Sequence, residues 1–233
     1  ALMLAVAGVA SLAGNAALAD TGKLLLTGGV SSIDGAAGGG LTPWATIGTN
    51  ATDGEIGASA FVSRAVSQDY SLNVMGAALG YKDRVEVSVA RQDFDASPAI
   101  ALNGIAPFGV QPGQKIKMDI LGLKLRVAGD AVLDSDTLMP QIAVGLQYKN
   151  VDPGSIGSVL KFLDAKTQDT DFYVSATKLF LAQGILVNGT LRYTRANQNG
   201  LLGFGAASPG KDKASWVPEV SVAYLLSKNW VVG

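Results

Sequence analysis

Residues 116–148 read IKMDILGLKLRVAGDAVLDSDTLMPQIAVGLQY, and this stretch decides the fold. From residue 121 the first half alternates, so that one face carries Leu121, Leu123, Leu125 and Val127 while the other carries Gly122, Lys124 and Arg126. The second half repeats the alternation, with Ile142, Val144, Leu146 and Tyr148 opposite Ala143, Gly145 and Gln147. A period of two residues predicts β-strands with one apolar and one polar face. Such a pair suits a soluble sandwich or a membrane barrel.

Composition excludes several classes of function. The 233 residues carry a formal net charge of -1, which gives no electrostatic footprint for nucleic acid, and we expect no such partner. The sequence has no Cys and no His, so disulfides, thiolate ligands and the commonest general base are missing. We therefore expect no enzyme activity, and no catalytic, cofactor or metal site. The 29 Gly, spread through alternating segments, favour β structure with tight turns.

The first residues predict export from the cytoplasm. Residues 1–19 read ALMLAVAGVASLAGNAALA, the apolar core and A-x-A end of a secretory signal peptide whose basic start is missing. A membrane anchor helix is the alternative, but Asn15 and two Gly weaken it. We expect residues 20–233 to form one β-barrel domain. The sequence stops inside NWVVG, which reads as a strand just begun, so we expect this domain to be truncated at its C-terminus.

Alternation and turn residues predict about ten full strands and the start of an eleventh. The predicted strands are residues 23–33, 44–49, 55–66, 70–81, 84–94, 115–127, 138–151, 171–181, 185–196 and 216–226, with the next beginning at 230. The connection at 152–168 contains GSVLKFLDA, which predicts a short helix. Single-chain bacterial barrels have an even number of strands, so twelve or fourteen are expected in the intact protein.

The lengths of the connections distinguish a barrel from a sandwich. If every strand reverses direction, the three longest connections, after Phe94, Val151 and Ala196, lie at one end of the sheet. The turns at Lys82, Gln183 and Lys228 lie at the other. Outer-membrane barrels sort their loops in this way, and aromatic residues near the strand ends agree with interfacial girdles. The sequence thus predicts an all-β, antiparallel, up-and-down transmembrane barrel.

Two segments carry a family resemblance. They are LLLTGGVSSIDGAAGGGLTPWATIGTN at residues 24–50 and YLLSKNWVVG at residues 224–233. Here the chain resembles a proteobacterial family of secreted proteins of unknown function that are predicted to be outer-membrane barrels. The resemblance covers essentially the whole chain after the leader, and it implies a location in the outer membrane after cleavage of the signal peptide. It supplies no substrate and no catalytic residue. Family members continue for several more strands, which leaves twelve and fourteen both open.

The candidate site residues are charges that alternate with apolar neighbours: Glu86, Lys117, Asp119, Lys124, Arg126, Arg192 and Glu219. In a barrel we expect all of them to face the lumen, because a charge on the lipid face at mid-depth costs about 2–4 kcal/mol. Two interpretations stay open. The charges form salt bridges that pack a closed lumen, or they line a wet channel and set its selectivity.

Three other features have a plain and a functional interpretation. The glycines at 35 and 38–40 predict a hairpin loop, or a segment that folds into the barrel mouth as a plug. The aspartates at 93 and 95, 134 and 136, and 169 and 171 predict solvated loop charge, or calcium bridges to lipopolysaccharide. Residues 205–211 approach a phosphate-binding loop, but Asp212 stands where Ser or Thr is required, so an exposed loop is favoured.

These observations predict an outer-membrane barrel that serves as a passive pore or uptake channel for small solutes. Its partners would be outer-membrane lipid, lipopolysaccharide and an unidentified solute. A structural or adhesive barrel that does not conduct is the alternative. A barrel enzyme is a weaker one, because the sequence contains no His and its site would have to lie in a further segment.

Overall fold

Alternating segments of the chain form nine strands that pair into one antiparallel sheet. The computed structural model describes residues 30–49, 54–67, 70–95, 113, 115–129, 138–206, 212–227 and 230–233. The strands are β3 (Ile56–Val66), β4 (Ser71–Tyr81), β5 (Val85–Asp95), β6 (Lys115–Ala128), β7 (Gln141–Asp152), β8 (Gln168–Phe180), β9 (Ile185–Thr194), β10 (Ser215–Ser227) and β11 (Trp230–Val232). The sequence predicts each of them to within a few residues.

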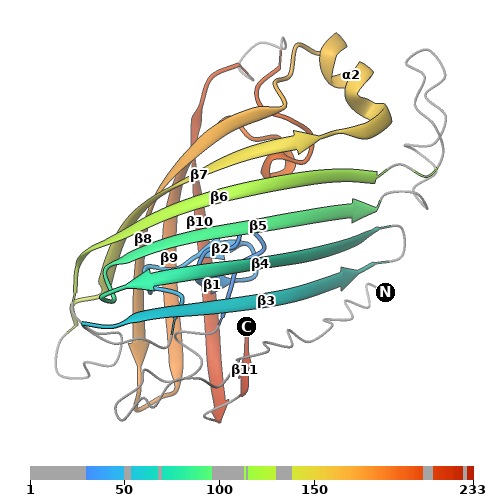
Figure 1. Ribbon diagram of the computed structural model, residues 1–233. Coiled ribbons are helices and arrows are strands. Elements are labelled where there is room, and N and C mark those ends of the chain that lie inside the picture. The colour runs from blue at the N-terminus through green and yellow to red at the C-terminus, as the bar shows by residue number, and fades with distance from the viewer. Residues whose placement is uncertain are drawn as a thin grey trace.

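The sheet, below called the wall, curves into a half-barrel (Figure 1). Every strand pairs with its neighbours in the chain, in the order β11 to β3, so the topology is up-and-down as predicted. Among the described residues β3 and β11 form the two edges of the sheet. The right-handed twist of strands makes a sheet of this size coil, and the coiling gives the wall a concave and a convex face.

The connections are sorted by length largely as the sequence predicts. With antiparallel neighbours throughout, the three longest connections, after β5, β7 and β9, share one end of the wall, here called the loop end. The turns after β4, β8 and β10 share the other, the turn end. Lys82 and Asp83 in the first of these turns both have φ of 49°. In a two-residue hairpin, positive φ at both central residues gives the turn a twist that matches the twist of the two strands it connects. The connection 129–140, also at the turn end, is longer than the others there.

Short helices occupy the loop end. The connection after β7 forms η3 (Gly154–Ile156) and α2 (Gly157–Phe162), which confirms the predicted helix. The connection after β9 contains η4 (Gln198–Gly200). No helix within the described ranges is long and apolar enough to cross a membrane. The predicted signal peptide at residues 1–19 lies outside the described residues.

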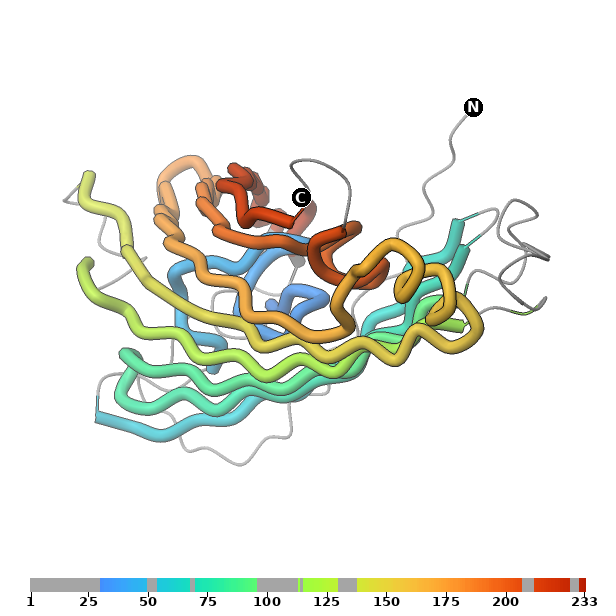
Figure 2. The backbone as a smooth tube through the Cα atoms, turned by 90° about the horizontal axis from the view of Figure 1, so that it is seen from above, coloured from blue at the N-terminus to red at the C-terminus, as the bar shows by residue number. Residues whose placement is uncertain are grey.

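Residues 30–49, called the inner segment, lie within the curve of the wall (Figure 2). Their only paired strands are β1 (Gly38–Gly39) and β2 (Thr42–Pro43), which form a small hairpin separate from the wall. A hairpin does form at these glycines, but it lies within the curve and does not connect two strands of the wall, which the sequence predicted it would. The prediction of wall strands at 23–33 and 44–49 is wrong wherever the structure describes these residues. Residues 44–49 are buried, and several of their backbone groups bind wall side chains in place of a neighbouring strand.

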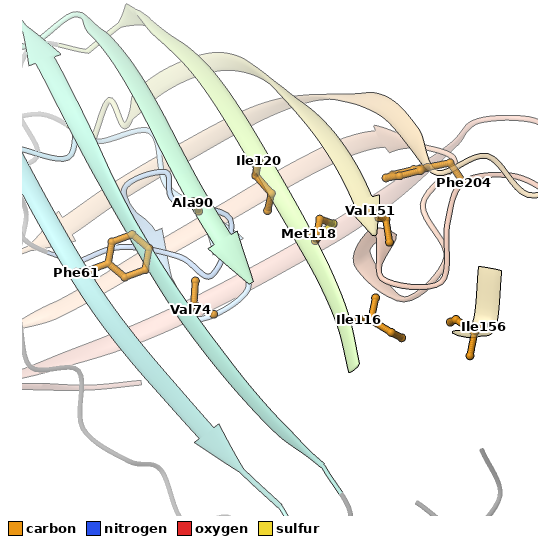
Figure 3. Packing of buried hydrophobic residues seen from close by; sticks show 9 residues of the cluster. All are labelled: Phe61, Val74, Ala90, Ile116, Met118, Ile120, Val151, Ile156 and Phe204. Atoms are coloured by element: carbon orange, nitrogen blue, oxygen red, sulfur yellow. The ribbon is translucent and has the colours of Figure 1, made fainter. Parts of the chain in front are cut away.

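Two apolar clusters fill the concave side at its two ends. At the loop end, Figure 3 shows the cluster that runs along the wall towards η3, formed by Phe61, Val74, Ala90, Ile116, Met118, Ile120, Val151, Ile156 and Phe204. At the turn end the buried members are Trp44, Leu179, Leu186 and Ala223. Between the two clusters the concave face is polar, and that region contains the candidate site.

Candidate functional site on the concave face

Glu86 and Lys124 form a buried ion pair on neighbouring strands. They are direct partners in the register of β5 and β6, and Lys124 Nζ lies 3.0 Å from Glu86 Oε1. Both side chains are 1% exposed. The Glu86 oxygens accept hydrogen bonds from the backbone N–H groups of Ala37, at 3.0 Å, and Gly48, at 2.6 Å. Lys124 donates to the carbonyls of Ala37 and Thr46. The pair therefore binds the backbone of the inner segment on both sides of its hairpin.

A group of wall hydroxyls and one amide binds the middle of the inner segment. Thr190 Oγ1 and Ser175 Oγ donate to the Pro43 carbonyl at 2.8 and 2.9 Å. The N–H of Ala45 donates to Thr177 Oγ1 at 2.7 Å, and that hydroxyl donates to Asn188 Oδ1. These wall residues come from the inward positions of β8 and β9, where small polar side chains leave room for the inner chain.

The inner segment also reaches the two sides of the wall. Trp44 Nε1 donates to Ser221 Oγ on β10 at 2.9 Å, and Ser59 Oγ on β3 donates to the Gly48 carbonyl at 2.5 Å. Strands that are far apart in the sheet thus meet through one short stretch of chain. Because buried backbone groups must find partners, these contacts fix both the path of the segment and the curvature around it.

Asp34 is the only charged residue of the inner segment, and it lies in a second buried network. Its Oδ2 is 3.3 Å from Lys149 Nζ and 3.4 Å from Arg192 Nη1. Its Oδ1 accepts hydrogen bonds from Asn199 Nδ2 at 3.0 Å and Gln92 Nε2 at 3.2 Å. The donors come from β5, β7, β9 and η4. We call Asp34 and these four residues the Asp34 cluster.

Two further carboxylates contact the cations of the cluster. Asp171 Oδ2 lies 3.1 Å from Lys149 Nζ and 3.6 Å from Arg192 Nη1, while Thr194 Oγ1 donates to Asp171 Oδ1. Glu219 accepts from Arg192 Nε at 2.5 Å. Burial acts to raise the pKa of the Asp34 carboxyl, but the charges of Lys149 and Arg192 and hydrogen bonds from Asn199 and Lys149 outweigh it, so the pKa lies below its ordinary value.

Five of the seven predicted site residues lie on the concave face. Glu86, Lys124, Arg192 and Glu219 belong to the two networks. Arg126 instead binds the turn end, where its Nε donates to the Asp83 carbonyl at 2.8 Å and its Nη1 to the Gly129 carbonyl at 2.7 Å. Arg126 therefore joins two adjacent connections at the turn end.

The prediction that Lys117 and Asp119 share this face is wrong. Both lie on the convex face of β6, and Asp119 pairs there with Arg91, at 3.1 Å. The apolar residues of β6 change faces along the strand: Ile116, Met118 and Ile120 point inward to the loop-end cluster, whereas Leu121 and its partners point outward. The consecutive apolar pair Ile120 and Leu121 marks the change in the sequence.

Sequence reasoning did not single out Lys149 or Asp34 as site residues. Lys149 lies at an inward position of β7, directly after the alternating apolar residues of its outward face. The alternation rule that selected Lys124 therefore also applies to Lys149. Asp171, predicted as solvated loop charge, is fully buried in the network. Asp169 beside it faces Arg195, with two contacts of 2.7 and 2.8 Å. Asp93 and Asp95 lie at the loop end of β5, and residues 134 and 136 lie outside the described ranges.

The convex face has an apolar band bounded by polar rows. Exposed Leu121, Leu123, Leu125 and Val127 of β6 continue across the wall in Val87, Val89, Val144, Phe172, Val174, Leu191, Val220 and Val222. Towards the loop end the register aligns Asn73, Asp93, Lys117 and Asp152 in one row, and Arg91, Asp119, Asn150 and Gln168 in the next. Phe172, Tyr193 and Trp216, also direct partners, form an aromatic row on the last strands.

Comparison with known proteins identifies the family of the chain. A family described as protein of unknown function (DUF3034) matches residues 27–233. The chain belongs to this family. No curated protein and no solved structure matches the chain significantly. The family match covers both the inner segment and the wall strands, so the two parts of the site both fall within the matched residues.

The wall side chains of the site in this DUF3034 protein contact the chain's own inner segment. Within the described ranges no group of three or more carboxylate, His or Cys side chains is placed to hold a metal ion. The donors and acceptors of the wall instead converge on one short peptide and one carboxylate. A surface of this kind holds a ligand through directed hydrogen bonds, and in this structure the ligand is the chain's own inner segment.

Proposed function

We propose that this DUF3034 protein is an outer-membrane β-barrel that acts as a passive pore or uptake channel for small solutes, with the inner segment narrowing its lumen. In this proposal the convex face meets lipid and lipopolysaccharide, the concave face lines the lumen, and a cleaved signal peptide delivers the chain. The curvature, the topology and the sorted connections are those expected of such barrels.

The observation that carries the proposal is the apolar band of the convex face together with the polar rows at its edge. A soluble sheet that exposes one face to water alternates apolar inside and polar outside. Between the two apolar clusters this wall does the reverse, with charged side chains inside and Leu, Val and aromatic side chains outside. On the long strand β10 the band extends from Trp216 to Leu226. At about 3.3 Å per residue and a tilt near 40°, such a span covers a membrane band of about 25 Å.

Closure of the ring requires further pairing at β3 and β11. Exposed edges in a membrane leave backbone groups without partners, which costs several kcal/mol for each group. We therefore propose twelve or fourteen strands in the closed barrel. A ring of this size is wider than wall side chains alone can fill, and the inner segment supplies the additional filling seen here.

A second candidate function is a structural barrel that does not conduct. The observation in its favour is the burial of the ion networks, because Lys149, Asp34 and Asp171 side chains are 0% exposed. A lumen packed in this way at both apolar clusters and between them leaves little room for water. The two candidates differ in whether the inner segment leaves its position.

The deciding experiment is a recording of current across a planar bilayer containing the natural full-length protein, refolded in detergent. Stepwise conductance that scales with salt supports the pore. A second recording with Lys124→Ala then tests selectivity, because the variant leaves Glu86 as an unpaired anion and should shift the reversal potential towards cation preference. A silent bilayer, from protein that migrates as a folded heat-modifiable barrel, contradicts the pore and favours the structural barrel.

A further inference from the structure

We propose that the wall residues around Asp34 form a binding site for a carboxylate, that Asp34 occupies it as an internal ligand, and that a small solute bearing a carboxylate competes for it and displaces the inner segment. The inference rests on the proposed pore function and gives that pore a substrate class, namely small organic acids. Its evidence is the geometry of the Asp34 cluster.

The site recognises both oxygens of a carboxylate. Lys149 and Arg192 lie beside Oδ2, while Asn199 and Gln92 donate to Oδ1. One carboxylate oxygen faces two cations, and the other faces two amide N–H donors. In a neutral amide one of these oxygens would be an NH₂ group facing two donors, so the site favours a carboxylate. The donors come from three strands and one loop helix, so no flexible stretch of chain carries the whole site.

The two cations of the site are held in position by partners other than Asp34. Lys149 Nζ also donates to Asn199 Oδ1 at 2.9 Å and to the Asn199 carbonyl at 3.1 Å. Arg192 donates to Gln147 Oε1 at 2.6 Å and to Glu219 at 2.5 Å. Because these contacts do not involve the inner segment, the positions of Lys149 and Arg192 do not depend on Asp34, whereas Gln92 also donates to the Ile33 carbonyl of the inner segment. A preorganised site binds an incoming ligand without first ordering its side chains.

Asp34 fits this site loosely. Charge-assisted N–H···O hydrogen bonds are usually about 2.7–2.9 Å long. The distances from Asp34 Oδ2 to Lys149 and Arg192 are 3.3 and 3.4 Å, longer than those the same cations make to Asn199 and Glu219. With Asp171 and Glu219 already in contact with these cations, Asp34 adds a third carboxylate to two cations in a buried site. An untethered carboxylate is free to adopt shorter contacts.

The position of Asp34 suits it to exchange with a solute. It precedes Gly35, whose φ of +92° turns the chain and whose missing Cβ leaves room for Ala90, 2.9 Å from where a Cβ would stand. The turn thus presents one side chain to the wall. Glu86 is the other carboxylate that joins the wall to the inner segment. It belongs to the wall, so a solute cannot take its place by displacing the inner segment.

Chemical rescue tests the site without requiring conduction. We would replace Asp34 by alanine in the full-length protein and follow thermal unfolding in detergent with sodium formate, and with formamide and sodium chloride as controls. We expect Asp34→Ala to unfold at a lower temperature than the wild type, and formate alone to raise its midpoint. Asp34→Asn, which fills the space without charge, and Asp119→Ala, on the convex face, should show no formate effect. An Asp34→Ala midpoint that does not respond to formate overturns the proposal.

The wild-type protein supplies the second readout, which also applies where Asp34→Ala does not fold. In acetate, proteolysis of the inner segment should become several-fold faster, and in acetamide it should not change. An equal rate in both solutions overturns displacement by a carboxylate. Formate rescue in a protein that never conducts would retain the binding site and contradict the pore, whereas conduction without rescue or acetate-dependent proteolysis would retain the pore and contradict the site.

Discussion

Glu86 and Lys124 show why a wall that faces its own inner chain carries buried charges. Burying an ion pair costs several kcal/mol per ion, and apolar residues of similar volume are often as stable. Here the pair also binds the N–H groups of Ala37 and Gly48 and the carbonyl of Thr46, contacts that apolar replacements could not supply. The charges thus determine where the inner segment binds, and the segment in turn compensates for their desolvation.

Through Asp34, the binding of the inner segment to the wall depends on pH. Its pKa lies below the ordinary value, so the carboxylate is bound more tightly in the folded protein than its protonated form. The stabilisation is fully present above the unfolded pKa of about 3.9 and is lost as the pH falls through the lower folded pKa. We expect proteolysis of the inner segment to be slow at neutral pH and to accelerate below about pH 4.

An acid-stable protease such as pepsin provides the measurement, with its rate on an unfolded reference peptide used to correct for its own pH dependence. The matched variant is Asp34→Asn, in which the inner segment lacks a titrating group. We expect its corrected cleavage rate to vary less with pH than that of the wild type. Identical profiles for the two proteins would show that Asp34 does not account for the acid effect.

At the scale of elements, the wall strands could be predicted because each has one apolar face. Predicted and observed bounds of β3, β4 and β9 differ by at most two residues at either end. The faces themselves were harder to assign. Lys117 and Asp119 follow the alternation of β6, but the strand passes from the apolar band to the loop end, where apolar residues point inward and charges outward. Period two, counted back from Leu121, places both charges on the outward face, and the consecutive apolar pair Ile120 and Leu121 marks the point where the apolar residues change faces.

The inner segment was the larger error, and its physical reason is local. Residues 44–49 read WATIGT, a short run that suits a strand buried on both sides. They are buried, and from Ala45 to Gly48 backbone groups bind side chains of β5, β6 and β8. Nothing in one sequence distinguishes such side-chain partners from those of a neighbouring strand. The glycines at 35 and 38–40 gave the only signal, because a hairpin or plug needs close approach and positive φ.

Gly80 tests the packing of the inner segment against β4. A Cβ added there would stand 2.6 Å from Thr49 Oγ1 and 2.9 Å from Ile47 Cγ2. Overpacking of this kind costs about 1–3 kcal/mol, so we expect Gly80→Ala to lower the free energy of unfolding by that amount. Unfolding in guanidinium chloride, with the slope of the transition unchanged, measures the loss.

Gly189 supplies the matched control, because it lies on the convex face of β9 and a Cβ there meets no atom within 4 Å. Gly costs about 0.5–1 kcal/mol relative to Ala in the interior of a strand, so Gly189→Ala should be neutral or stabilising. The two substitutions are thus expected to act with opposite sign. If Gly80→Ala is tolerated as well as Gly189→Ala, the inner segment does not press against β4.

At the scale of the whole molecule, the distribution of polar side chains is inverted relative to that of a soluble sheet. Charges and amides hold the inner segment within the curve, and Leu, Val and aromatic side chains cover the outside. Large contiguous apolar surfaces of this kind mark interaction sites, and a band that crosses most of the strands and ends in polar rows matches a lipid bilayer more closely than a protein partner.

A charge placed in this band distinguishes lipid from water. Leu123 lies in the middle of the band on β6 and is 44% exposed. If the band faces lipid, Leu123→Arg should destabilise the barrel in phospholipid vesicles by about 2–4 kcal/mol. If it faces water, the same arginine is a surface substitution and should change stability by no more than about 0.5 kcal/mol.

Asn150→Arg is the matched substitution, since Asn150 lies on the same convex face, in the polar row beside Asp119. We expect this variant to insert into vesicles and to unfold in urea like the wild type. Reversible unfolding titrations in vesicles of the natural full-length protein and both variants measure the difference. Equal stability of Leu123→Arg and Asn150→Arg would mean that no lipid contacts β6 at Leu123, and the outer-membrane location would then have to be abandoned along with the pore.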